Sequence, residues 1–194
     1  MLWIISGPSS AGKSTFLESQ RCRDITLTSS NTPVRFAFES DWTTTLNSSD
    51  CLFHYNILRA AFRRRRRSGQ NHWRRLWQKF FRIAAATAPL ESTAFTTDPV
   101  WRQLLETDVS KTAVVLVASQ ERIFDRISKR DKVEEEMPSG MPNKYSREEW
   151  KSLYEMIDVA KVYQAWVDEL EKQKIEYLLL NSDESDFRLM PRLP

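Results

Sequence analysis

One eight-residue loop near the start of the chain limits the possible fold more than any other feature. Residues 7–14 read Gly-Pro-Ser-Ser-Ala-Gly-Lys-Ser, which fits the pattern G-x-x-x-x-G-K-S, and they follow a short apolar run at residues 2–5. The residues just after the loop favour the start of a helix. A strand, a glycine-cornered loop and a helix in this order form a unit that binds phosphate groups. The sequence therefore predicts an α/β domain with a phosphate-binding loop.

The loop holds the residue types that this chemistry needs. Gly7 and Gly12 allow backbone angles and close approach that a Cβ would block, so that N–H groups can face phosphate oxygens. The first turn of the helix adds its positive dipole end. Lys13 can reach the β- and γ-phosphates of ATP or another nucleoside triphosphate, and the Ser14 hydroxyl can ligate Mg²⁺. The predicted nucleotide-binding residues of the loop are Gly7, Ser9, Ser10, Ala11, Gly12, Lys13, Ser14 and Thr15.

Length and composition indicate one domain. A chain of 194 residues can bury a three-layer core without disulfides, and its two cysteines, Cys22 and Cys51, have no metal-binding or redox spacing. The apolar run at the N-terminus is too short for a signal peptide, and the run at 113–118 is too short for a membrane span. We expect a cytoplasmic protein with reduced thiols and no transmembrane segment.

Apolar runs separated by helical patterns predict the arrangement of the sheet. Strands are expected at 2–6, 34–38, 51–55, 114–117 and 175–180, and residues 25–28 favour a short extended segment. Helices are expected at 13–21, around 73–84, after the Asp98-Pro99 cap, and from the Ser146 capping box through Leu170. Alternation of this kind predicts a three-layer α/β/α domain with a parallel, roughly five-stranded sheet and a ligand at the carboxyl ends of the strands.

Together the loop at 7–14 and the segment at 114–130 make the chain resemble the small P-loop kinases, which include adenylate, shikimate, gluconate and nucleoside kinases. The resemblance implies a single kinase-like domain over 1–194, with a basic helical insertion at about 59–95 and a lid at about 119–147. Lid arginines of such kinases close over the transferring phosphate, and Arg122, Arg126 and Arg130 are spaced to share one helical face. The alternative is a solvated helix in which Glu121 and Asp125 pair with these arginines.

The resemblance also implies an acid at the end of the second strand. Asp41 is the candidate base for the acceptor hydroxyl and Glu39 the alternative, although Asp41 can instead cap the following turn. Trp42 is a candidate for stacking on a base or sugar. Such kinases use an aspartate at the end of an apolar strand for magnesium, but here Asn56 occupies that position. Either Asp41 or Glu39 then supplies the carboxylate for the metal, or Ser14 and the nucleotide hold it. The nearby His54 is either a packed core residue or a catalytic one.

A block of positive charge occupies the middle of the chain. Residues 51–90 contain no Asp or Glu but ten Lys and Arg residues, including the run from Arg63 to Arg67. This block can bind an anionic small-molecule acceptor, can bind nucleic acid or an anionic membrane surface, or can be a solvated insertion that pairs with acidic residues elsewhere. Arg59, close to the predicted cleft, is the member that we assign to substrate.

The predicted function is an ATP- and Mg²⁺-dependent phosphotransferase that moves the γ-phosphate to a hydroxyl of a sugar, a nucleoside or a nucleotide. Lys13, Asp41, Arg126 and Arg130 are the predicted catalytic residues, Arg122 assists nucleotide binding, and Glu39, Asp41, Trp42, Asn56 and Arg59 are assigned to the acceptor. One alternative is a kinase or NTPase that acts on nucleic acid through Arg63 to Arg67. Another is a non-catalytic nucleotide-binding or sulfotransferase-like protein.

Overall fold

In the part of the chain that the structure describes, five parallel strands and one short antiparallel strand form the central sheet. The computed structural model describes residues 1–26, 35–38, 51–58, 95–96, 98–129, 155 and 157–194. The strands lie in the order β2-β3-β1-β4-β5-β6. Their bounds are β1 Leu2–Gly7, β2 Arg35–Phe38, β3 Cys51–Asn56, β4 Lys111–Val117, β5 Glu176–Asn181 and β6 Leu189–Met190. The predicted five-stranded parallel sheet is confirmed.

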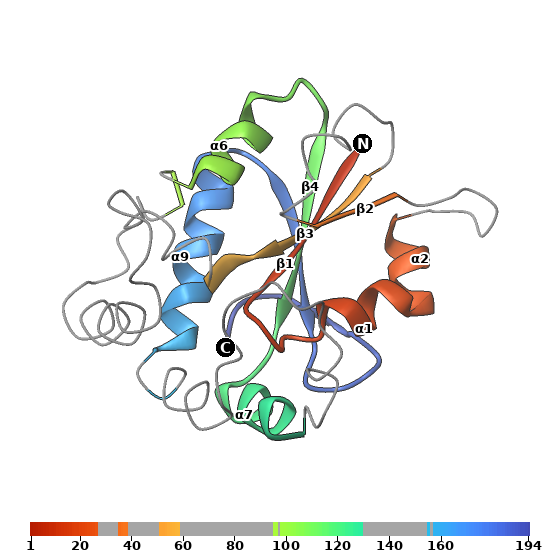
Figure 1. The fold of residues 1–194 in the computed structure, drawn as a ribbon, viewed down its shortest axis with the longest axis vertical. Helices are drawn as coiled ribbons and strands as arrows, with labels where there is room; N and C mark the ends of the chain where they lie inside the picture. The colour runs from red at the N-terminus through yellow and green to blue at the C-terminus, as the bar shows by residue number, and fades with distance from the viewer. Residues whose placement is uncertain (27–34, 39–50, 59–94, 97, 130–154, 156) are drawn as a thin grey trace, which may run out of the picture.

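Helices cover both faces of this sheet, which gives the three layers that the sequence predicts. In Figure 1, α1 (Lys13–Glu18) and α2 (Gln20–Thr26) lie on one side of the strands. The opposite side carries α6 (Pro99–Glu106) and α9 (Val159–Lys172), while α7 (Gln120–Lys129) lies below the end of β4. Strand β1 pairs with β3 on one side and β4 on the other. The loop that follows β1 therefore lies at the carboxyl ends of the strands, between the ends of β3 and β4.

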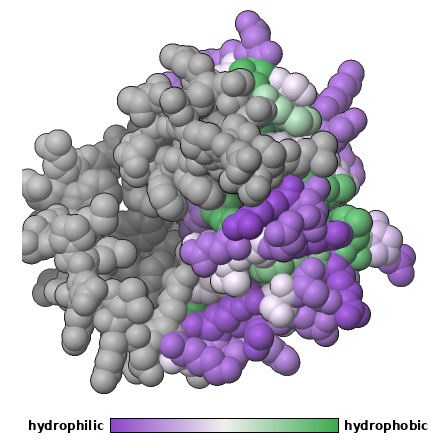
Figure 2. All heavy atoms as spheres, turned by 90° about the vertical axis from the view of Figure 1, so that its right-hand side faces the viewer, coloured by the Kyte–Doolittle hydropathy of each residue, from purple (hydrophilic) through white to green (hydrophobic). Residues whose placement is uncertain are grey.

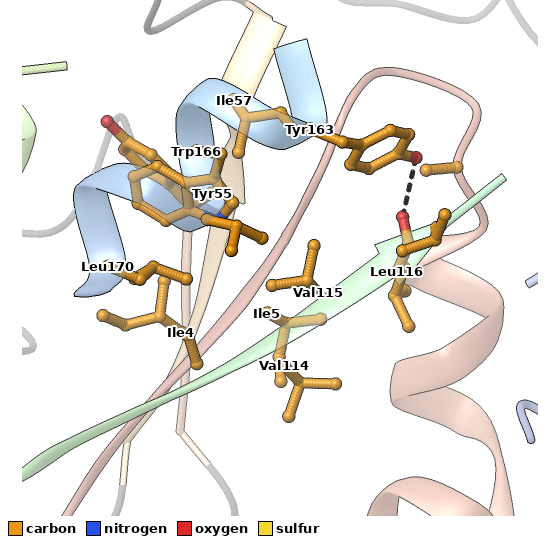
Figure 3. Packing of buried hydrophobic residues seen from close by; sticks show 14 of the residues in the cluster. Ile4, Ile5, Tyr55, Ile57, Val114, Val115, Leu116, Tyr163, Trp166 and Leu170 are labelled. Atoms are coloured by element: carbon orange, nitrogen blue, oxygen red, sulfur yellow. Dashed lines mark hydrogen bonds between the residues drawn. The ribbon is translucent and has the colours of Figure 1, made fainter. Parts of the chain in front are cut away.

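Aromatic side chains fill the core between the sheet and the helices α6 and α9. Trp101 and Trp166 are fully buried, and their rings meet edge to face with centroids 4.7 Å apart. Figure 3 shows Tyr55 of β3 against Trp166 of α9, with 5.1 Å between ring centroids. Tyr55 also donates a hydrogen bond of 2.8 Å to the carboxylate of Asp98, the predicted helix cap. The side chain of Asp98 makes no capping hydrogen bond to the N–H groups of α6.

The structure differs from the sequence prediction at several element ends. The helix expected over 13–21 stops at Glu18 because Ser19 is extended, and its hydroxyl donates to the carbonyl of Phe16 and accepts from the N–H of Cys22. A second helix starts there, so residues 25 and 26 are helical and the extended segment expected at 25–28 is wrong for them.

The helix expected to run from Ser146 through Leu170 is interrupted. The described part begins anew at Val159, where the side chain of Asp158 accepts a hydrogen bond from the N–H of Lys161. The capping box at Ser146 lies outside the described residues. The short antiparallel strand β6 was not predicted.

The described surface is mainly polar. Figure 2 shows the face that carries α1 and α2, where hydrophilic side chains dominate and hydrophobic ones form small patches. Within the described ranges the large hydrophobic residues that stand exposed are Met1 and Leu189. No helix among these residues is long and apolar enough to cross a membrane. The thiol of Cys22 is buried, which raises its pKa to about 11 and fits the inert thiol expected from the sequence.

Candidate phosphate-binding site

A cavity opens where the parallel strands end, next to the loop at 7–14. Strand β1 ends at Gly7 and its neighbour β3 at Asn56, and these two residues are paired in register. The cavity has a volume of about 500 Å³. The loop, the end of β3 and helix α7 form its wall, with the residues Ser9, Ser10, Gly12, Lys13, Ser14, Thr15, His54, Asn56, Arg122, Asp125, Arg126 and Lys129. The cavity thus lies at the carboxyl ends of the strands, where the sequence predicts a ligand.

Three residues of the loop have positive φ angles, which residues other than glycine rarely adopt. Gly7, Ser10 and Gly12 have φ angles of 154°, 64° and 86°. A Cβ on Gly7 would lie 3.0 Å from the carbonyl oxygen of Leu116 in β4, so glycine is required by the close approach of two strands. Successive N–H groups in such a turn form a concave site for anions. The positive φ angles lie at both glycines of the loop, where the sequence predicts backbone angles that a Cβ would disfavour.

Lys13 lies at the centre of this loop. Its side chain is only 4% exposed, and its Nζ donates hydrogen bonds to the carbonyl oxygens of Gly7, at 2.9 Å, and Pro8, at 2.6 Å. These contacts hold the ammonium group against the first two residues of the loop. A cation in this position can exchange carbonyl contacts for phosphate contacts by a small side-chain movement.

Two side chains from β3 reach the same wall. Residues two apart on a strand point to the same side, so His54 and Asn56 face the loop while Tyr55 faces α9. Asn56 donates a hydrogen bond of 2.9 Å to the hydroxyl of Ser9 and so braces the loop. Burial, with the nearby charge of Lys13, lowers the pKa of His54 to about 4. His54 is therefore neutral at pH 7 and adds no charge to the cavity.

Helix α7 supplies the other cations. Arg126 donates from Nη1 to the carbonyl oxygen of Ser10 at 3.2 Å and from Nη2 to the carbonyl oxygen of Ser182. Burial, followed by the nearby charge of Arg122, lowers the pKa of Arg126. Gly12 leaves room for this guanidinium, since a Cβ there would lie 3.2 Å from its Nη1. Arg126 thus joins the phosphate loop to the segment after β5.

That segment was not among the predicted site residues. Ser182 follows β5 and donates from its hydroxyl to the carbonyl oxygen of Ala11 at 2.7 Å. The carboxylate of Asp183 accepts from the N–H of Ser119 at the start of the β4–α7 connection, at 2.9 Å. A polar Asn-Ser-Asp run directly after a predicted parallel strand was the available signal, because the carboxyl ends of such strands meet at one edge.

Charge and unfilled hydrogen-bonding capacity make the cavity suited to an anion. Among its described wall residues, Lys13, Arg122, Arg126 and Lys129 are positive and Asp125 is negative. Ser10 Oγ and Arg122 Nε are buried without a hydrogen-bond partner among the described residues. Buried polar groups normally have partners, so these two atoms leave hydrogen-bonding capacity unused beside the cavity.

The predicted site residues divide into two groups. Six of the eight predicted loop residues line one cavity together with Asn56, Arg122 and Arg126, whereas Gly7 and Ala11 do not line it. The ion pair of Arg122 with Asp125 that the alternative interpretation predicts is also present, at 3.0 Å. Glu39, Asp41, Trp42, Arg59, Arg130 and the arginines from Arg63 to Arg67 lie outside the described residues, and their roles stay predictions.

The described residues form a three-layer α/β domain with a mainly parallel sheet. No protein-family model matches the chain, and no curated protein matches it. Among solved structures, it is similar to a deoxyadenosine kinase from M. mycoides with bound dATP, at 13% identity and a TM-score of 0.48, covering 96% of this chain and 94% of that one. It is also similar to an unliganded sugar kinase from Janibacter sp. HTCC2649, at 17% identity and a TM-score of 0.36, covering 94% and 86%.

Proposed function

We propose that this protein is a phosphotransferase that moves the γ-phosphate of ATP, or of another nucleoside triphosphate, to a hydroxyl group of a small molecule. The observation that carries the proposal is the cavity in which the glycine-cornered loop, Lys13 and the cations of α7 face one another. Phosphoryl transfer depends on positioning and on stabilising charge, and this cavity supplies both.

The loop would hold the donor. Backbone N–H groups of the loop after Pro8 would bind the phosphate oxygens, and the first turn of α1 would add partial positive charge. Lys13 would leave the carbonyl groups of Gly7 and Pro8 for the β- and γ-phosphates. As charge moves onto the bridging oxygen of the departing diphosphate, Lys13 stabilises it.

The arginines of α7 would act on the other side of the phosphate chain. Arg122, whose Nε lacks a partner among the described residues, faces the cavity and would bind the transferring group directly. Arg126 is fixed to the loop through Ser10, so it would add charge and hold the loop in shape. Arg130, outside the described residues, is proposed as the third arginine of a lid over about 119–147.

The acceptor would enter from the ends of β2 and β3. In the proposal, Asp41 accepts the proton of the attacking hydroxyl while the phosphoryl group moves, with Glu39 as the alternative base. Trp42, Asn56 and Arg59 would line the acceptor side, and an anionic acceptor such as a sugar phosphate would suit Arg59. The products are the phosphorylated acceptor and the nucleoside diphosphate.

The residues present fit magnesium bound mainly through the nucleotide. Within the described ranges no group of three or more His, Cys, Asp or Glu side chains could hold a metal ion by itself. Ser14 is exposed to the cavity at the start of α1, and Mg²⁺ commonly keeps several waters and takes phosphate oxygens with one or two protein ligands. Ser14 would hold the ion, which when bound neutralises charge on the β- and γ-phosphates.

A screen for acceptor-dependent ADP release tests this proposal. Purified protein is incubated with ATP, Mg²⁺ and a panel of sugars, nucleosides and nucleotides, and Lys13→Ala serves as the blank. We expect one class of hydroxylated compound to raise ADP release well above the acceptor-free rate, and Asp41→Asn to reduce that increase by about a hundredfold or more. ADP release that no acceptor changes, or that persists in Lys13→Ala, would contradict the proposal.

A further inference from the structure

Asp125 interrupts the positive wall of the phosphate cavity. It lies on α7 with Arg122, Arg126 and Lys129, at spacings of three and four residues that place all four on one face of the helix. Its Oδ2 accepts from Arg122 Nη1 at 3.0 Å, and its Oδ1 lies 2.8 Å from Lys129 Nζ. One carboxylate therefore engages two of the cations that a phosphate chain would use.

These ion pairs are weak enough for a ligand to replace them. The side chains of Arg122, Asp125 and Lys129 are 42%, 36% and 72% exposed, and ion pairs of that kind contribute little because water screens them. Arg122 Nε is buried without a partner among the described residues, so Asp125 leaves part of the guanidinium unsatisfied. A phosphate group offers three acceptor oxygens and more charge than one carboxylate.

We propose that Asp125 is an internal counter-ion of the phosphate site, which holds Arg122 and Lys129 until the phosphate chain of the donor displaces it. This inference rests on the proposed function, because it assumes that the cavity binds phosphate. A ligand that binds here must replace the contacts that Asp125 makes with Arg122 and Lys129. Only a chain with several charged groups can pair with both of these cations at once. Asp125 thus lowers the affinity of the site and favours polyphosphate over a single small anion.

Calorimetric titration with inorganic tripolyphosphate at low salt tests this role. Asp125→Asn removes the charge with almost no change in size. Glu121→Gln is the matched control, since Glu121 is exposed on the same helix and does not line the cavity. We expect Asp125→Asn to bind tripolyphosphate about three- to tenfold more tightly than the wild type, and Glu121→Gln to stay within about twofold. Asp125→Glu should restore weaker binding.

A double-mutant cycle shows whether Asp125 acts through Arg122. In an Arg122→Gln background the gain from Asp125→Asn should shrink, because one of its two partners is already gone. If Asp125→Asn binds no more tightly than Glu121→Gln, or the gain is unchanged in the Arg122→Gln background, the inference is wrong. The proposed function fails separately: wild type and Lys13→Ala would then bind tripolyphosphate equally poorly.

Discussion

Adding one methyl group to either glycine of the loop tests how the backbone builds the site. In Gly12→Ala the new Cβ lies 3.2 Å from Arg126 Nη1, which is the far end of a flexible side chain and can move aside. The main cost is then the φ angle of 86°, about 1–2 kcal/mol for a residue other than glycine. A domain of this size loses about 2–4 °C in Tm per kcal/mol, so we expect a decrease of about 2–8 °C.

Gly7→Ala should cost more because its neighbours cannot move. Its Cβ would lie 3.0 Å from the carbonyl oxygen of Leu116 and 3.1 Å from the Cβ of Ala11, at a φ angle of 154°. Overpacking of about 1–3 kcal/mol adds to a backbone strain of about 1–2 kcal/mol, and the total of about 2–5 kcal/mol gives an expected loss of about 4–20 °C. Scanning calorimetry of the two variants shows which of them loses more in Tm. A Gly12→Ala loss equal to or larger than that of Gly7→Ala would refute the close approach of β1 and β4.

Four further predictions concern the rest of the domain. Tyr163→Phe should destabilise the fold by about 1–3 kcal/mol in urea unfolding, because its buried hydroxyl bonds the carbonyl of Leu116 and the N–H of Ala118 at the end of β4 (Figure 3). Lys174→Gly should stabilise it by about 0.5–1 kcal/mol, since Lys174 has a φ of 54° after the end of α9. The pKa of His54 is 6.5 in the unfolded chain and about 4 in the folded protein, so the unfolded chain takes up a proton first as the pH decreases. The free energy of unfolding should therefore drop by about 2 kcal/mol between pH 6.5 and pH 4. His54→Gln should remove that part of the pH profile. In a Cys51→Ser background the remaining thiol, Cys22, should react with iodoacetamide at pH 7.5 at least tenfold more slowly in the native protein than in urea, and equal rates would show that it is not buried.

Much of the fold follows from short-range sequence signals. The apolar runs at 2–5 and 113–118 predict β1 and β4 because central parallel strands are buried on both faces, and both strands are buried along nearly their whole length. The loop between β1 and α1 follows from its glycines and lysine. Helix α9 was expected, but its start was misplaced because Asp158 forms a second cap within an apparently continuous pattern.

The parts that the sequence did not reveal depend on long-range contacts. Ser182 reaches the loop only because β5 lies two strands away in the same sheet, and no local pattern encodes its bond to Ala11. Strand β6 has two residues, too few for periodicity. The charge of Asp125 was visible in the sequence, but its place in the cavity wall depends on how α7 packs below β4.

Titration of the protein with ATP and with GTP in a calorimeter, in the presence of Mg²⁺, tests the central claim most directly. If the loop at 7–14 wraps a phosphate chain, the wild type will release heat on binding at least one of them, and Lys13→Ala will weaken that binding by about tenfold or more while its thermal stability stays within a few degrees. The absence of any binding heat from the wild type, or equal affinities in the two proteins, would contradict the account.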